Sequence, residues 1–395
     1  MIHVGIDIGK LNHCFCIINY DTGEDLVQPT FFENNQDGFN FLIHSLSPYP
    51  IDKLLIGMED TGHYHFALLR FLLDKNFTVA LMNPSITDFE RKRQGSASKN
   101  DKLDTITICD VLASNPHKKK LYRLITPNNF KYYEMKQLTR QHHNLKEQKN
   151  VYSNRLQRAL DLTFPEFNSL FKSKYGIVYM NILKTFGSAD NIAHTDIRTL
   201  RKCFETIGKG NRISLSPEKL KDTAKASVGF ASMAEVLNIK HLVAHIELIN
   251  EQISEIDKKI EEFSVQVNSP ILTIPGISHF SGTSILSELG EICNYDNLSK
   301  VIKFAGVAPR EYESSQYRAE HMAITKKGSK YLRKTLYQII TPVIRHNEVF
   351  QKYYNKKISQ GKGHRCAQGH CVRKLLRVIY HLLITNQQFD PTLLR

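Results

Sequence analysis

The chain has 395 residues and a formal net charge of +14. Its composition, 41% hydrophobic and 23% charged, is typical of a globular protein with two or more domains. No run of about 18 apolar residues occurs, which excludes a conventional membrane span. The 7 cysteines follow no disulfide or zinc spacing and the start of the chain resembles no signal segment, so we expect a cytoplasmic protein.

The positive charge is concentrated near the C-terminal end. Residues 300–395 contain 19 Lys and Arg but 5 Asp and Glu, an excess of +14 that equals that of the whole chain. Such an excess indicates a surface that binds the phosphates of a nucleic acid, although a solvated basic face gives the same pattern.

The first 125 residues predict an α/β domain. β-rich segments that alternate or form buried apolar runs predict strands over 1–8, 13–20, 27–33, 53–58 and 77–82. Helices are expected over 36–46 and 63–75, after Pro84 and from about Asp101. Antiparallel strands followed by alternating strands and helices are typical of a mixed α/β fold.

A helical region is expected over residues 126–268. A polar helix is predicted over 128–162, and 166–235 is irregular and helix-rich. Apolar residues then recur at alternating spacings of three and four, which predicts a coiled-coil helix. These residues are Ile239, Leu242, Ile246, Ile249, Ile253, Ile256, Ile260, Phe263 and Val267. Their partner is either the 128–162 helix or a second subunit.

A C-terminal helical domain is expected over residues 269–395. Residues 271–290 predict a short helix, a turn at Pro275 and Gly276, and a second helix. Further helices are predicted over 296–304, 329–345, 347–359 and 366–386.

Four acids stand at the positions where a metal site is expected. Asp7 interrupts an apolar strand, Glu59 follows another, and Asp101 and Asp104 share one face at the start of a helix. Phosphodiester cleavage uses hard cations, which take carboxylate ligands. Each acid alone is as well explained by a turn or a helix cap, so the prediction depends on their order and spacing.

Two sets of motifs resemble the DEDD transposases of the insertion sequence 110 family. The N-terminal set is GIDIGK (5–10), MEDTGHYH (58–65), LMNPS (81–85) and KNDKLD (99–104). The C-terminal set is IPGIS…SGTSILSELGEI (274–292), KFAGVAPREYESS (303–315) and ITKKGSKYLRKTLY (324–337). Asp60, Asn100 and Thr105 depart from the family pattern, but none of these changes affects the four acids.

The resemblance implies the fold and the chemistry. The first domain is then RNase H-like (RuvC-like), with Asp7, Glu59, Asp101 and Asp104 as ligands of Mg²⁺ or Mn²⁺. The C-terminal transposase domain begins with a helix-hairpin-helix-like motif. It carries a nucleophilic serine five residues after a proline, which is Ser314 after Pro309. Ser315 stands where the family has glycine and is the alternative nucleophile; a structural loop serine pair explains both without catalysis.

The resemblance further implies a DNA transposase or recombinase that acts on donor and target double-stranded DNA. A structured guide RNA and a homo-oligomer, a dimer or tetramer, are implied as well. The alternatives are a RuvC-like junction-resolving nuclease, a non-catalytic DNA-binding protein and a sugar-kinase or actin-like ATPase. A junction-resolving nuclease would need neither the 303–315 block nor the long coil. A non-catalytic DNA-binding protein would not need the four acids. An ATPase is disfavoured because the sequence has no Walker-type phosphate loop.

Each of three further groups of side chains can be explained either by a binding role or by an ordinary structural position. The basic runs 91–93 and 118–120 can bind a nucleic-acid backbone or face solvent. The His and Cys residues between His364 and Cys371 match no zinc spacing, and a basic loop explains them better. Tyr353 and Tyr354, among lysines, can stack on bases but are more often core residues.

Overall fold

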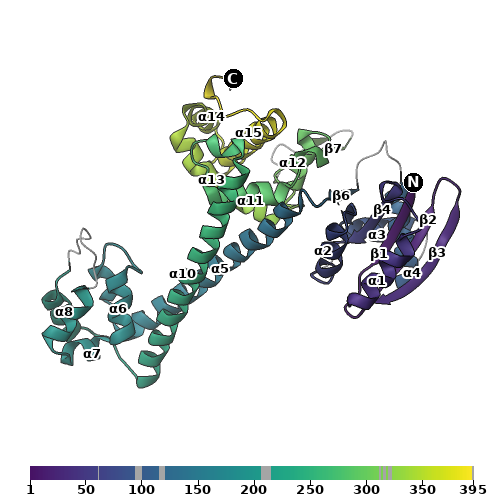
Figure 1. Cartoon of the computed structure of the whole chain (residues 1–395). Coiled ribbons are helices and arrows are strands. Elements are labelled where there is room, and N and C mark those ends of the chain that lie inside the picture. The colour runs from purple at the N-terminus through teal and green to yellow at the C-terminus, as the bar shows by residue number, and fades with distance from the viewer. Residues whose placement is uncertain are drawn as a thin grey trace. The chain divides into compact units, whose positions relative to one another are not determined.

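The structure is a computed structural model that describes residues 1–60, 62–93, 100–114, 121–205, 215–310, 313–314, 317–318 and 323–393. Its contacts divide the chain into two compact units. Unit 1 combines Met1–Lys136 with Asn268–Arg395, and unit 2 is Gln137–Val267 (Figure 1). Among the described residues, no helix is both long enough and apolar enough to cross a membrane.

A six-stranded mixed sheet forms the N-terminal part of unit 1. Its strands are β1 (Ile2–Asp7), β2 (Asn12–Asn19), β3 (Glu24–Glu33), β4 (Leu54–Glu59), β5 (Val79–Met82) and β6 (Tyr122–Ile125). Their order is β3-β2-β1-β4-β5-β6, with β1, β4 and β5 parallel and the other pairings antiparallel. The strand that carries Asp7 is therefore in the interior of the sheet.

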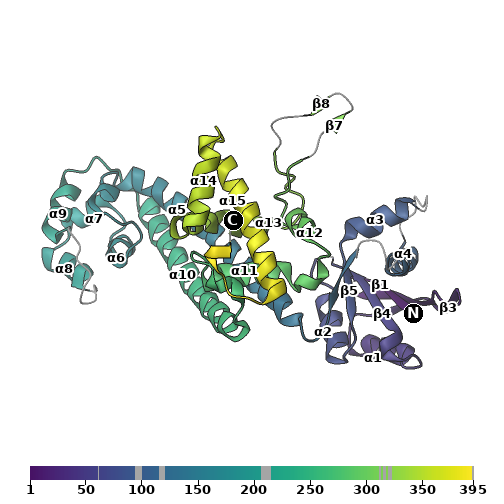
Figure 2. The ribbon, with the colours of Figure 1, turned by 90° about the horizontal axis from the view of Figure 1, so that it is seen from above.

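Helices cover both faces of this sheet. They are α1 (Gln36–Leu46), α2 (Phe66–Asp74), α3 (Pro84–Arg93) and α4 (Asp101–Ala113). Because side chains alternate along a strand, Val4 and Ile6 of β1 pack with α1 and α2 in the main core. His3, Gly5 and Asp7 belong to the opposite face, which α4 covers. Figure 2 shows α1 and α2 on one side of the sheet and α3 and α4 on the other.

Two glycines allow α4 to approach the sheet closely. A Cβ atom on Gly5 would lie 2.0 Å from the Thr105 carbonyl oxygen of α4. A Cβ atom on Gly57 would lie 2.8 Å from the Leu112 side chain of the same helix. Any larger residue at these positions needs the helix or its side chains to move, so the glycines set how close the first turn of α4 comes to the strand ends.

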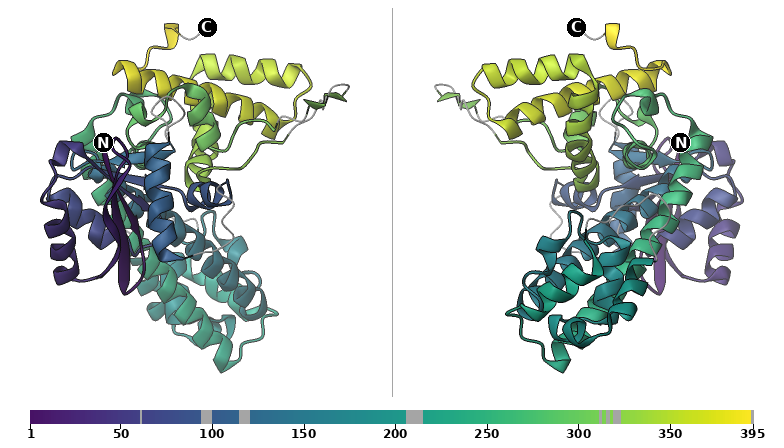
Figure 3. Two further views of the ribbon diagram at one scale, coloured as in Figure 1. Left: turned by 90° about the vertical axis from the view of Figure 1, so that its right-hand side faces the viewer. Right: turned by 90° about the vertical axis from the view of Figure 1, so that its left-hand side faces the viewer.

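The C-terminal part of unit 1 is helical. Its helices are α11 (His279–Leu289), α12 (Leu298–Phe304), α13 (Lys330–His346), α14 (Glu348–Ser359) and α15 (His364–Thr385). Helix α13 packs against α11, α14 and α15, and Figure 3 shows the last helices lying together. Two polar contacts join α11 to α13: Ser284 lies 2.9 Å from Thr335, and Ser329 donates to Glu288 at 2.8 Å.

Unit 2 contains most of two long helices and a small helical cluster. Its helices are α5 (Phe130–Thr163, which begins in unit 1), α6 (Ile177–Thr185), α7 (Ala189–His194), α8 (Ile197–Glu205), α9 (Pro217–Lys225) and α10 (Met233–Val267). Short 3-10 turns lie at Ile51–Lys53, Phe167–Leu170, Pro270–Thr273, Ile292–Asn294 and Pro391–Leu393 across the two units.

Helices α5 and α10 pack antiparallel. His142 lies 3.2 Å from Asp257, and the rings of Tyr152 and His245 stack at 4.9 Å, so later positions on α5 meet earlier positions on α10. Eight of the nine positions of the apolar repeat of α10 are buried as expected, Ile246 fully, and Val267 is half-buried. The chain's own α5 is therefore a partner of this helix, and a regular supercoil stays a prediction.

The mixed sheet and its helices are consistent with a DEDD nuclease-like fold, as the sequence predicted. The structure adds β6, a four-residue edge strand too short to show a clear alternation. It also shows that the first expected helix in 271–290 is the 3-10 turn Pro270–Thr273, since the glycine turn follows too soon for an α-helix.

Candidate active site

Two acids lie at the ends of neighbouring parallel strands. Asp7 is the last residue of β1 and Glu59 the last of β4, and the pair before them, Ile6 and Met58, is in register. Each acid lies two residues beyond a glycine that faces α4. Strand alternation therefore directs both carboxylates to the α4 side of the sheet.

The first turn of α4 supplies the other two acids. Asn100 caps the helix by accepting from the Lys102 amide at 3.0 Å, and Asp101 and Asp104 follow in the first turn. Carboxylates are favoured there because the helix N-terminus carries partial positive charge. Asp104 is buried, and its neighbour Thr105 is the residue packed over Gly5.

The four acids act on one another electrostatically. Burial, and then the charges of Asp101, Asp104 and Glu59, raise the pKa of Asp7 from 3.8 to about 6. A carboxylate surrounded in this way is stabilised by a nearby cation, because the cation offsets both the lost hydration and the repulsion. In the structure, the other three predicted acids are therefore close enough to Asp7 for their charges to raise its pKa.

Side chains of α3 hold two of these acids. Arg91 donates to Asp104 at 2.9 Å and to Asp88 at 2.6 Å. The Thr87 hydroxyl donates to Glu59. Sequence reasoning missed both contacts; the only signal was the Pro84-led helix that directly follows β5. Arg91 is thus a structural counter-charge in this arrangement, rather than a solvated residue.

The four carboxylates are suitable ligands for a hard cation, although their side chains are widely spaced in this structure. Within the described parts of the chain, no three His, Cys, Asp or Glu side chains are close enough together to hold a metal ion. The chemistry of the set still fits Mg²⁺ or Mn²⁺, which prefer carboxylate oxygens and retain several waters. The raised pKa of Asp7 supports the same fit, since a cation relieves its cause.

The proposed serine lies in a small hairpin. Strand β7 (Glu313–Ser314) pairs antiparallel with β8 (Tyr317–Arg318), and Ser314 is opposite Tyr317. A bridge between Pro309 and Ile324 lies further along the same two chain segments. Ser315 lies outside the described residues.

The other side chains singled out in the sequence have ordinary protein partners. Lys92 pairs with Asp88 at 2.7 Å, and Arg93 pairs with Glu90 at 2.5 Å. Residues 118–120 lie outside the described residues.

The two histidines of the His and Cys group make hydrogen bonds to side chains. His364 lies 2.7 Å from the Tyr354 hydroxyl, and His370 lies 3.0 Å from Arg373. Cys371 is buried and Cys366 exposed. Residues 364–371 all lie in the first turns of α15, so the basic loop expected here is helix instead.

Comparison with known proteins identifies the family. A DEDD family of IS110 type, described as "Transposase", matches residues 4–165. The "Transposase IS116/IS110/IS902 family" matches residues 268–355. The first match contains all four acids, and the second contains Ser314.

Relatives of similar length agree. The chain is 23% identical over 393 residues to the "Pilin gene-inverting protein" of Moraxella lacunata, covering 98% of this chain and 97% of the relative. The protein of the same name from Moraxella bovis gives the same values. The "Transposase for insertion sequence element IS1328" of Yersinia enterocolitica is 30% identical over 102 residues, which is 25% of this chain and 30% of the relative. With both family regions present in order, the chain belongs to the IS110 family of transposases and recombinases, enzymes that bind and process DNA.

Proposed function

We propose that this protein cuts and rejoins DNA strands at a composite site made of a metal-bound acidic cluster and a serine nucleophile. The observation that carries the proposal is the convergence of Asp7, Glu59, Asp101 and Asp104 on one face of the sheet, expressed in the raised pKa of Asp7. An RNase H-like fold for this domain is supported by the interior position of β1 and by α4 beside it.

The four acids would hold Mg²⁺ or Mn²⁺. When bound, such an ion polarises the phosphoryl oxygen and stabilises charge on the attacking and leaving oxygens. The chain's own part is to place the carboxylates: the strand ends fix Asp7 and Glu59, and the close approach of α4 fixes the aspartates. Thr87 and Arg91 orient Glu59 and Asp104 before the ion arrives.

Ser314 would form the covalent link to DNA. Its Oγ attacks the scissile phosphorus, the bond from phosphorus to the deoxyribose oxygen breaks, the hydroxyl proton leaves to solvent, and the departing oxygen takes up a proton. The serine–phosphate ester retains the bond energy needed for rejoining. Two relatives named as gene-inverting proteins support rejoining, rather than simple hydrolysis, as the outcome.

The proposal includes a structured guide RNA and a homo-oligomer, in keeping with family resemblance. Three apolar side chains that are close in the sequence of unit 2 support self-association: Val228, Phe230 and Met233 are 83%, 78% and 88% exposed. Exposed apolar patches often mark protein interfaces. Replacing Phe230 and Met233 with Ser should lower the mass measured by light scattering, whereas Leu248→Ser, at a separately exposed site, should not. An unchanged mass would remove this surface as the interface.

The experiment that tests the whole proposal uses isosteric acid variants. Asp101→Asn should abolish Mg²⁺-dependent cleavage of element-end DNA while leaving the melting temperature within a few degrees of the parent. Asp74→Asn, at an exposed acid paired with Arg70, is the matched control and should cleave normally. Full cleavage by Asp101→Asn would exclude the acidic site from the chemistry.

A further inference from the structure

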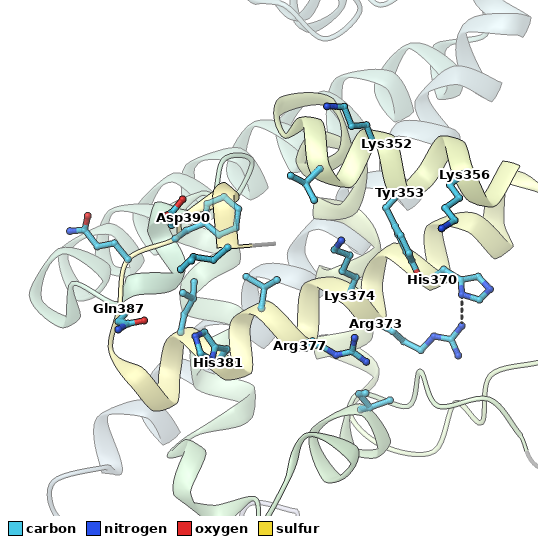
Figure 4. Close-up of a pocket in the computed structure, with 17 residues that line it drawn as sticks. Lys352, Tyr353, Lys356, His370, Arg373, Lys374, Arg377, His381, Gln387 and Asp390 are labelled. Atoms are coloured by element: carbon cyan, nitrogen blue, oxygen red, sulfur yellow. Dashed lines mark hydrogen bonds between the residues drawn. The ribbon is translucent and has the colours of Figure 1, made fainter. Parts of the chain in front are cut away.

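A groove of about 1130 Å³ runs along α14 and α15 among the C-terminal helices. One part of its wall is basic and another part is apolar (Figure 4). The basic residues are Lys352, Lys356, Arg373, Lys374 and Arg377. The apolar residues include Ile302, Val378, Leu382, Phe389 and Leu393. Among the described residues that line the groove, Asp390 is the single carboxylate.

The cations of this groove are crowded together. Of the carboxylates in the described residues, none forms an ion pair with Lys356, Arg373 or Arg377. Burial, with a contribution from nearby Arg377, lowers the pKa of Lys374. Burial and then the charge of Arg373 lower the pKa of His370. Repulsion between neighbouring positive charges lowers their pKa values, and a bound anion would reduce this repulsion.

The aromatic ring in this wall is set among the cations. The Lys374 ammonium lies 4.9 Å from the centre of the Tyr353 ring, and that of Lys357 lies 5.4 Å from it. Tyr353 is only half-buried and lines the groove, so one part of the ring stays accessible. A partly exposed ring beside a group of cations is an arrangement on which unpaired bases stack.

A duplex explains these features less well than a single strand. Duplex DNA presents phosphates outward and keeps its bases stacked inside. Its bases therefore offer no free face that could contact an apolar wall beside the cations. An unpaired segment presents both chemistries at once, phosphates and free base faces. We propose that the groove between α14 and α15 binds an unpaired nucleic-acid segment, with phosphates on Lys356, Arg373 and Arg377 and a base against Tyr353.

This inference rests on the proposed recombination activity, because strand exchange must separate paired strands. It is tested by binding alone, on the full chain and in EDTA, where the acidic site can do no chemistry. Failure of the groove therefore stays distinguishable from failure of the catalytic proposal, which the acid variants test by cleavage.

The probes are a 12-nucleotide oligothymidine, an abasic strand of the same length, an oligouridine and a hairpin duplex, each carrying a fluorophore. The parent should bind oligothymidine about 5–150-fold more tightly than the abasic strand, the range expected for one stacked base. Tyr353→Leu should lose that preference and keep its affinity for the abasic strand. Comparison of oligouridine with oligothymidine tells whether the strand is supplied by RNA or by DNA.

The charge arm uses two double variants. Arg373→Ala with Arg377→Ala should weaken oligothymidine binding and reduce the salt slope by about 1.4, since each phosphate contact to a single strand contributes about 0.7. Lys362→Ala with Arg365→Ala removes equal charge just outside the groove and should change neither. Equal losses in both double variants, or a parent that binds abasic and thymidine strands equally, would overturn the proposal.

Discussion

Gly5 and Gly57 are direct partners in the parallel ladder of β1 and β4, and both lie beneath α4. They face different atoms of the helix. Gly5 is opposite the Thr105 backbone carbonyl, whereas Gly57 is opposite the Leu112 and Ile108 side chains. Backbone cannot yield without moving the helix, whereas a leucine side chain can change rotamer. The two glycines therefore have unequal roles in positioning Asp101 and Asp104.

We predict that Gly5→Ala is far more harmful than Gly57→Ala. The Gly5 variant must shift α4 and should lower the free energy of unfolding by about 1–3 kcal/mol, as overpacking does. It should also lose most cleavage activity, because the aspartates move with the helix. Gly57→Ala should retain most of both. Urea unfolding and metal-dependent cleavage measure the two effects, with Gly363→Ala, which has open space for its Cβ, as the control. Equal behaviour of the two variants would contradict this account.

The raised pKa of Asp7 predicts a pH-dependent stability. Because its folded-state pKa of about 6 exceeds its usual 3.8, the folded protein binds this proton more tightly than the unfolded chain. The resulting stability is present below about pH 4 and is lost as pH rises through 6. Asp7→Asn should thus match the parent at pH 4 and exceed it by about 1–3 kcal/mol at pH 8 in EDTA.

Added Mg²⁺ provides the second arm of that test. At pH 8 it should stabilise the parent and leave Asp7→Asn unchanged, as measured by urea unfolding. If Asp7→Asn is less stable than the parent at both pH values, the Asp7 carboxylate stabilises the fold, and the account of it as a metal ligand that destabilises the metal-free protein is wrong.

Arg91 should behave as a counter-charge that a bound cation partly replaces. Arg91→Ala leaves buried Asp104 without its partner, so we expect a lower melting temperature in EDTA and substantial recovery in Mg²⁺. Lys92→Ala is the matched control, because Lys92 pairs with the half-buried Asp88 and with no other acid among the described residues. Its melting temperature should change little in either buffer. A loss in Arg91→Ala that Mg²⁺ does not recover would mean that the arginine has a purely structural role.

The nucleophile prediction is tested by trapping. Ser314→Ala should bind DNA normally, since the basic residues are untouched, but should form no protein–DNA adduct on denaturing gels. Ser315→Ala should keep some adduct. The reverse pattern would assign the nucleophile to Ser315, and adducts in both variants would end the serine mechanism for this protein.

The packing of α5 on α10 should contribute strongly to the stability of unit 2. Ile246→Ala removes a fully buried side chain and should reduce the free energy of unfolding by about 2–5 kcal/mol. Leu248→Ala on the same helix, at a position that is 50% exposed, should cost less than about 0.5 kcal/mol. Calorimetry on both variants checks the difference. Similar losses would mean that the helices separate in solution.

The elements with strong periodicity were predictable from the sequence. The helix at Gln36–Leu46 and the buried positions of α10 match the expectation because a repeated apolar spacing fixes both the element and its face. β6 was not predictable, since four residues at a sheet edge depend on β5 for their conformation.

The candidate site likewise has some residues that the sequence predicts and some contacts that it does not. The four acids are predicted from their order and spacing together with the family resemblance, and their role as metal ligands stays a prediction. The contact of Arg91 with Asp104 and that of Thr87 with Glu59 could not be predicted, because they depend on how α3 packs. The groove at α14 and α15 was visible in the sequence only as an excess of positive charge near two tyrosines.

Unit 1 consists of two chain segments, with unit 2 between them, and this has a consequence for synthesis. The sheet and its acids leave the ribosome first, while residues from Asn268 onward follow roughly 7–26 s later at typical rates of translation. An unfinished chain therefore carries the acidic face without the basic helices or Ser314. Under the composite-site proposal, a truncated or stalled product that ends before Asn268 would lack the serine and would not join DNA strands.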